Sequence, residues 1–244
     1  MNGKIDIKIS GSGMIGGGEY GAVRISGSGT LKDTVRCEEL RVSGSARSDG
    51  EIACTGEVAI SGSAHTEKDL SGGEIAVSGS LRASSVAAQK ELRVSGSVRA
   101  QEKIRAGSVK FSGSLSCREL EAERVEGSGA IRCEGLLNAE EVDLAFRSRC
   151  TVGSIGGGTV RIRPHKNRET AVRLPLLSSL LGGADGFEVT EAIEADTAAL
   201  EGVKAERVTC RIAAIGAGCT IDLLQYSETA EISPDATVKK CEKV

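Results

Sequence analysis

Apolar residues alternate with polar ones in short runs along this chain, and many of these runs end at a Ser-Gly-Ser tripeptide. The residue before each tripeptide is apolar, and so is the residue two positions earlier. Alternation with period two is typical of short strands that turn one face inward. A fixed period over many copies indicates a repeat protein, and the tripeptides recur at steps of about 17 residues. The six clearest copies begin at Ser26, Ser43, Ser61, Ser78, Ser95 and Ser112.

The strands within one repeat are too short to form a sheet with their neighbours in sequence, and hairpin signals between them are lacking. Each strand can instead pair, in parallel and in register, with the equivalent strand one repeat later. The sequence therefore predicts an all-β fold, a parallel β-helix or β-solenoid, with coils of about 17 residues stacked at a spacing of about 4.8 Å.

The period divides the chain into three parts. Residues 1–163 form the predicted main solenoid, and residues 187–244 a second solenoid part with a short tail, continuous with the first. Residues 164–186 lie outside the period, begin at Pro164 and contain a leucine-rich run. We expect a loop or short helix there, and its leucines are candidate partner contacts: Leu176, Leu177, Leu180 and Leu181.

Composition supports a narrow core. Aromatic residues make up 2% of the chain, glycines number 32 and prolines 3, which suits many tight corners joined by uninterrupted ladders. The eight cysteines lack the short paired spacings of zinc sites. Cys37 and Cys54, like Cys133 and Cys150, are separated by one full period. We expect them to stack on each other as free core thiols, with no metal bound.

Apolar and polar residues already alternate in the first residues, as they do in a strand, and no run of 18 apolar residues occurs. This pattern predicts no signal peptide and no membrane-spanning helix. It therefore predicts a cytoplasmic location. Gly11, Gly13 and Gly16 match the spacing of a dinucleotide fingerprint, but no helix is predicted after them, so no nucleotide site and no cofactor is expected.

Charged residues recur with the same period on the outward positions. The acidic file is Glu39, Glu57, Glu74 and Glu91, and a basic file beside it is Arg24, Arg41, Arg93 and Lys110. A further file follows the tripeptides, at Arg47, His65, Arg82 and Arg99. The favoured interpretation is a solvated surface of mixed charge. A sharper one makes Arg47, Arg82 and Arg99 a docking stripe for anionic lipid, protein or nucleic acid. Nucleic acid is the least favoured, because the net charge is −3 and aromatic residues for base stacking are lacking.

The iterated apolar-Ser-Gly-Ser coils of about residues 22–130 resemble the core of the bactofilins, a family of bacterial polymer-forming cytoskeletal proteins. The stretch from Glu188, through Ile215-Gly-Ala-Gly-Cys-Thr-Ile-Asp222, to Glu228 resembles the second part of the longer members found in Firmicutes. The resemblance implies a right-handed β-helix and filaments that form end to end without nucleotide. It also implies a scaffold for cell-shape, envelope or motility factors.

The partners that this resemblance implies are further copies of the chain, a second bactofilin paralogue, and envelope or motility proteins. Some members carry a short apolar membrane-targeting motif at the N-terminus, which is not found in Met-Asn-Gly-Lys. Membrane contact is therefore left open, and a position at the inner face of the membrane would be reached through partners.

Physical reasoning points to the same assembly. The terminal coils of a solenoid expose strand edges that can pair with another chain, and we expect no capping helix. A contact between copies that does not close on itself produces a filament. The candidate self-assembly residues are Ile5, Ile7, Ile9, Ile221 and Leu223.

Two other functions compete with the filament. A monomeric adaptor would use the charge files and the leucine run without assembling. A β-helical acyltransferase is less favoured, because it requires three hexapeptide repeats per coil and a histidine at a subunit interface. The two histidines, His65 and His165, are more simply surface residues. The sequence therefore predicts no enzyme and no catalytic residues.

Overall fold

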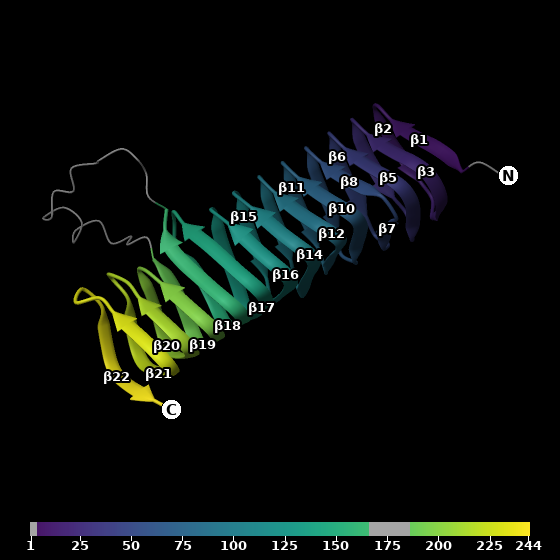
Figure 1. Cartoon of the computed structure of the whole chain (residues 1–244). Coiled ribbons are helices and arrows are strands. Elements are labelled where there is room, and N and C mark those ends of the chain that lie inside the picture. Colours follow the sequence, from purple (N-terminus) through teal and green to yellow (C-terminus); the bar gives the residue numbers. More distant parts are fainter. Residues whose placement is uncertain (1–3, 166–185) are drawn as a thin grey trace, which may run out of the picture. The chain divides into compact units, whose positions relative to one another are not determined.

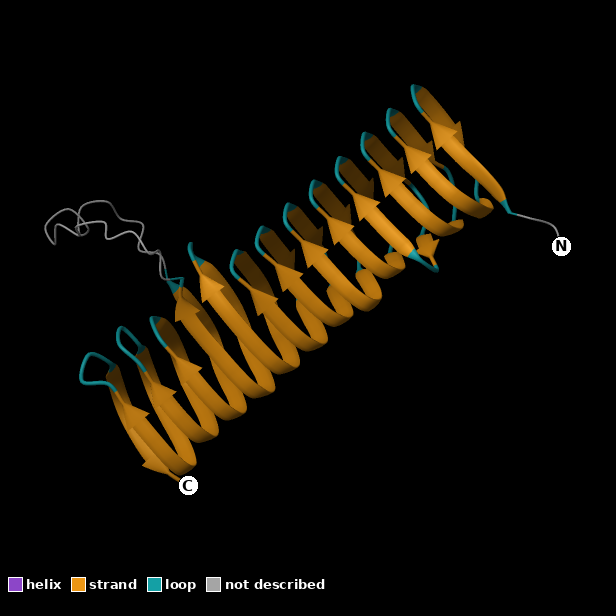
Figure 2. Ribbon diagram, turned by 45° about the horizontal axis from the view of Figure 1, so that its top comes forward, coloured by secondary structure: helices purple, strands orange, loops and turns teal. Residues whose placement is uncertain are grey.

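The computed structural model describes residues 4–165 and 186–244. These residues form a parallel β-solenoid of about 13 turns with roughly 17-residue spacing, which confirms the predicted fold class (Figures 1 and 2). The chain divides into two compact units, Met1–Glu126 and Gly127–Val244. The repeat pattern does not mark this division, and each unit is described separately below.

The first unit consists of short strands joined by tight corners. The strands are β1 (Ile5–Ile9), β2 (Ser12–Ile15), β3 (Gly18–Ile25), β4 (Ser28–Leu31), β5 (Val35–Val42), β6 (Ser45–Ser48), β7 (Ile52–Cys54), β8 (Glu57–Ile60), β9 (Ser63–Thr66), β10 (Leu70–Val77), β11 (Ser80–Ala83), β12 (Val86–Val94), β13 (Ser97–Ala100), β14 (Lys103–Phe111), β15 (Ser114–Cys117) and β16 (Glu119–Gly127), whose last residue falls in the second unit. Each pairs in parallel with the equivalent strand of the next coil, as β10 does with β12 and β12 with β14.

The core of the first unit lies inside the coils, where side chains of one type stack from coil to coil. Val58, Ile75 and Leu92 occupy equivalent positions in three successive coils, and none is more than 1% exposed. Aliphatic columns of this kind fill the narrow interior without any tryptophan, because each coil covers the apolar side chains of the one before it.

The Ser-Gly-Ser corner closes each coil through the backbone. Ser78 and Gly79 both donate their N–H groups to the carbonyl of Ile60, at 2.9 and 3.1 Å. Ser80 then donates to the carbonyl of Gly62 at 2.9 Å. The same three hydrogen bonds recur one coil on. The tripeptide is thus a backbone device that turns the chain while keeping its polar groups paired.

The second unit has longer strands that bend through the corners. They are β17 (Ala130–Phe146), β18 (Cys150–Pro164), β19 (Phe187–Leu200), β20 (Val203–Ile215), β21 (Thr220–Ile232) and β22 (Thr237–Lys243). The ladder is continuous across the out-of-period segment, since Cys150 of β18 lies opposite Phe187 of β19. The rings of Phe146 and Phe187 pack with centroids 6.0 Å apart.

Two sequence expectations are wrong in this unit. Cys133 lies opposite Val152, not Cys150, because the coil there is longer than the regular period. The short tail expected after Pro234 is instead strand β22, which pairs in parallel with β21. Cys37 and Cys54 of the first unit do stack in register, as predicted.

Candidate assembly edges and charged faces

The N-terminal coil of the first unit presents an open strand edge. Among the described residues, β1 pairs only with β3 and β2 only with β4. Of the predicted edge residues, Ile9 is buried and Ile7 half-buried, whereas Ile5 is 69% exposed. Met14 is 66% exposed in β2, at an outward position opposite Thr30. The first coil therefore combines unpaired backbone with exposed apolar side chains.

The direction of these unpaired backbone groups follows from the ladder. The N–H of Ser26 donates to Ile9 of the preceding coil at 2.9 Å, whereas the carbonyl of Ile25 accepts from Ser43 of the following coil at 2.8 Å. Inward residues thus direct their backbone groups to the next coil, and outward residues to the previous one. By this alternation, the outward residues Asp6 and Lys8 of β1 turn their N–H and C=O groups toward the open edge.

The C-terminal edge of the second unit is not where the sequence placed it. Ile221 is fully buried in β21, and Leu223 is half-buried there. Both lie opposite residues of β22, Val238 and Lys240 respectively, so neither is at an edge. The correction follows from the added coil: β22 pairs with β21 alone among the described residues.

The inward positions of β22 are left uncovered. Cys241 lies in register with the buried Leu224, and Val238 with Ile221. Cys241 is nevertheless exposed and Val238 half-buried, because no further described strand covers them. Val244, at the end of this coil, is 69% exposed. The last coil thus presents the same combination of open edge and exposed core positions as the first.

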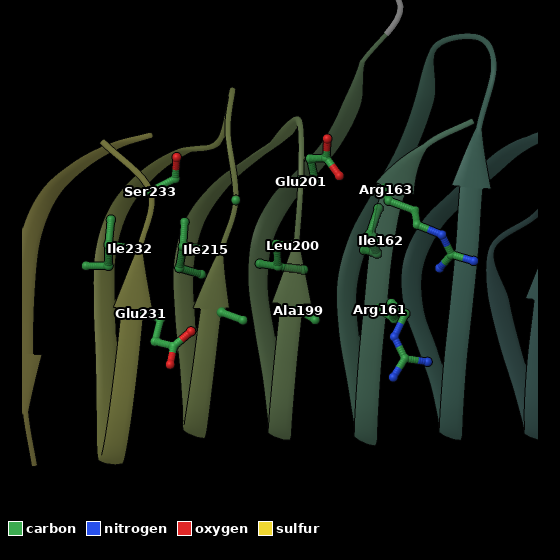
Figure 3. Close-up of a pocket in the computed structure, with 12 residues that line it drawn as sticks. Arg161, Ile162, Arg163, Ala199, Leu200, Glu201, Ile215, Glu231, Ile232 and Ser233 are labelled. Carbon is green, nitrogen blue, oxygen red and sulfur yellow. The ribbon is translucent and has the colours of Figure 1, made fainter. Parts of the chain in front are cut away.

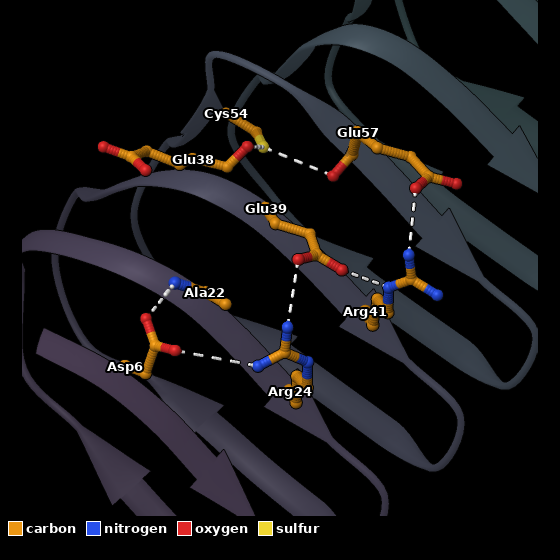
Figure 4. A network of polar contacts seen from close by, with 8 residues as sticks. All are labelled: Asp6, Ala22, Arg24, Glu38, Glu39, Arg41, Cys54 and Glu57. Carbon is orange, nitrogen blue, oxygen red and sulfur yellow. Dashed lines mark hydrogen bonds and ion pairs between the residues drawn. The ribbon is translucent and has the colours of Figure 1, made fainter.

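One outward face of the first unit, formed by β3, β5, β8, β10, β12 and β14, is electrostatically compensated. We call it the paired face. Arg24 contacts Asp6 at 3.8 Å and Glu39 at 3.1 Å. Arg41 pairs with Glu39 and, at 3.1 Å, with Glu57 of the next coil (Figure 4). These alternating contacts join successive coils.

The predicted basic file runs along this face as expected, in the order Arg24, Arg41, Ala59, Ala76, Arg93 and Lys110. Glu91 forms ion pairs with both Arg93 and Lys110. The hydrogen bond from Arg41 lowers the pKa of Glu39 below its usual range. The Glu39 carboxylate is therefore held in its charged form by the neighbouring arginine.

A second face of the first unit is formed by the four-residue strands β4, β6, β9, β11, β13 and β15. We call it the serine–arginine face. Its outward side chains form two columns along the coils. One column is Ser28, Ser45, Ser63, Ser80, Ser97 and Ser114; the other is Thr30, Arg47, His65, Arg82, Arg99 and Ser116. The predicted file of Arg47, His65, Arg82 and Arg99 is therefore one continuous column.

The cysteines lie mainly in the core of the described part of the chain. Seven cysteines are buried and Cys241 is exposed. Burial raises the pKa of Cys150, Cys210 and Cys219, and the adjacent thiol together with burial raises that of Cys37. No group of three or more potential metal ligands occurs among the described residues. Nor do they include a helix with the length and apolar character to cross a membrane.

A groove of 540 Å³ lies at the strand ends of the second unit (Figure 3). Ile162, Leu200 and Ile215 of three adjacent coils line it, together with the partly exposed Ile232. Arg161 and Arg163 stand at its rim, and both contact Asp143. The groove can hold an apolar side chain, and its arginines are already engaged.

The remaining predicted residues are placed as follows. Leu176, Leu177, Leu180 and Leu181 lie outside the described residues. His65 is half-buried within the arginine column, and His165 follows β18, where its backbone N–H donates to the Phe146 carbonyl at 2.8 Å. Comparisons with protein-family models, with curated proteins and with solved structures find no match to this chain.

Proposed function

We propose that this chain is a non-catalytic scaffold that assembles end to end into nucleotide-independent filaments and recruits envelope, shape or motility factors. The observation that carries the proposal is the pair of open strand edges, β1 at the N-terminal coil and β22 at the C-terminal coil. An unpaired parallel strand edge is a template for a strand of another copy. Contacts that use both ends, and that do not close on themselves, would produce filaments.

Exposed apolar residues give a second line of support. Four of the six large hydrophobic side chains exposed among the described residues lie in or next to the terminal coils: Ile5, Met14, Ile232 and Val244. Ile5 and Ile232 stand at inward positions, which interior coils bury at Cys37 and Ile215, so stacking another copy would remove these two side chains from water. The same stacking would supply partners for the backbone groups of β1 and β22.

The test removes one backbone donor from the open edge without touching the ladder within the chain. Lys8→Pro deletes an N–H that, by the alternation of β1, is directed away from β3. Proline is tolerated at such edge positions. Lys8→Ala is the matched control, because it removes the side chain and keeps the N–H. Electron microscopy and light scattering, with no nucleotide added, measure assembly, and circular dichroism reports folding.

We expect filaments from the wild type and from Lys8→Ala, and only short particles from folded Lys8→Pro. The proline blocks one end, so long filaments are lost whichever ends meet. Wild-type protein that remains monomeric at all concentrations would contradict the proposal and favour the monomeric adaptor. Filaments of normal length from Lys8→Pro would show that β1 is not an assembly edge.

A further inference from the structure

The two charged faces of the first unit differ in one respect: only the paired face neutralises its own cations. Arg47, Arg82 and Arg99 are exposed, and none has an ion pair with another described residue, unlike Arg24, Arg41 and Arg93. The outward positions of β4, β6, β9, β11, β13 and β15 carry serine, threonine, arginine and histidine, with no carboxylate among them. This face therefore presents positive charge that the described part of the chain leaves uncompensated.

The arginines are also held in a repulsive arrangement. Arg82 lies directly opposite Arg99, and His65 lies between Arg47 and Arg82 in the same column. Successive coils are about 4.8 Å apart, a distance at which like charges in register are unfavourable. An external anion would relieve this repulsion. The parallel column of serines adds hydroxyl donors suited to phosphate oxygens.

We propose that the serine–arginine face binds the surface of a bilayer that contains anionic phospholipids. The face is a sheet of short strands, broad enough to lie against a surface. Lipid headgroups move laterally and can match the column without a fixed spacing. Basic side chains close to an anionic leaflet gain affinity from its negative potential, and salt screens that gain. The absence of aromatic side chains from the described outward positions of this face disfavours single-stranded nucleic acid, which requires stacking platforms.

The contact itself does not rest on the proposed assembly, but its strength in the assembled state does. One copy contributes three arginines, which gives weak, reversible binding. A filament would repeat the column once per copy and multiply the affinity through avidity. Binding of a single copy can therefore be measured in the Lys8→Pro background, where failure to bind lipid and failure to assemble are separate observations.

The experiment is co-sedimentation with vesicles of phosphatidylcholine alone or mixed with phosphatidylglycerol, at low and high salt. Arg82→Gln/Arg99→Gln removes two charges from the serine–arginine face. The matched control, Arg41→Gln/Arg93→Gln, removes two charges from the paired face. We expect the first double variant to lose about thirtyfold in affinity for the anionic vesicles, and the control to bind like the parent. His65→Arg should raise the affinity about fivefold.

Three results would overturn the proposal. Equal losses in both double variants would mean that net charge alone drives binding. Unchanged binding in Arg82→Gln/Arg99→Gln would remove this face from the contact. If inorganic polyphosphate binds the protein tightly while anionic vesicles do not, the face takes a soluble phosphate polymer and not a bilayer.

Discussion

Gly79 lies directly over Gly62 of the preceding coil, so closely that a Cβ atom on Gly79 would overlap the Gly62 carbonyl oxygen. The same relationship joins Gly96 to Gly79 and Gly113 to Gly96. The glycine of the tripeptide is therefore required by the close approach of two backbones and not by an unusual φ angle, since these positions are absent from the positive-φ glycines. The stacked corner leaves no room for any side chain.

We predict that Gly79→Ala destabilises the first unit by about 1–3 kcal/mol, because backbone atoms must move apart to admit the methyl group. Ser78→Ala, at the adjacent exposed position, should change stability by less than about 0.5 kcal/mol. Chemical denaturation followed by circular dichroism measures both. Equal stability of the two variants would show that the corner can relax.

The rings of Phe146 and Phe187 anchor the ladder on either side of the out-of-period segment. Phe187 is 1% exposed and begins β19. Phe187→Ala should cost about 3–5 kcal/mol, and Phe187→Leu less than about 2 kcal/mol. Because each coil of a solenoid contacts mainly its neighbours, hydrogen exchange should rise in β18, β19 and β20 and stay unchanged in β3 to β8. Uniform loss of protection would contradict this local dependence.

The repeat made the fold and most registers accessible from sequence. The column Arg47, His65, Arg82 and Arg99 follows from the regular period alone, and the same period could have located the last strand. Val238 lies one period after Ile221, and Cys241 lies one period after Leu224. Pro234 and the polar residues that follow it obscured this strand in the sequence. Polar residues are tolerated there because no described strand covers the inward side of β22.

Two other features could not be predicted from the period. Cys133 pairs with Val152, which lies beyond the position that the period predicts, because extra residues are accommodated at a bulge whose position the sequence does not mark.

The compensation of charge also depends on the distance between neighbouring files of side chains. Arg24 reaches Glu39 at 3.1 Å, whereas Arg82, on another face, has no carboxylate beside it on its strand. Periodicity places both arginines on the surface and does not distinguish them.

The Glu39 carboxylate provides a test of the paired face. Arg41 lowers its pKa, so Glu39 should titrate below an ordinary glutamate in carbon-detected NMR, and Arg41→Gln should return its pKa toward the usual range. Since the pKa of Glu39 is lower in the folded state than in the unfolded state, the pair stabilises the fold at pH values above the unfolded-state pKa. That contribution is lost as the pH falls toward the folded-state pKa. An unchanged Glu39 pKa in Arg41→Gln would exclude the ion pair as its cause.

Cys241 provides a built-in reporter of assembly. It is the exposed thiol among the eight cysteines, so a thiol reagent should modify one cysteine rapidly in the folded monomer and all eight after unfolding. Burial holds back the others, since it raises the pKa of several of these thiols and the thiolate is the reactive form.

Assembly through β22 should cover Cys241 and slow its modification at least tenfold, because a further coil then occupies the position that leaves it exposed in the single chain. Lys8→Pro identifies the polarity. Protection of Cys241 that persists in this variant indicates contact between two C-terminal coils, whereas its loss indicates contact between the C-terminal coil and β1. Filaments in which Cys241 reacts as fast as in the monomer would exclude β22 from the assembly contact.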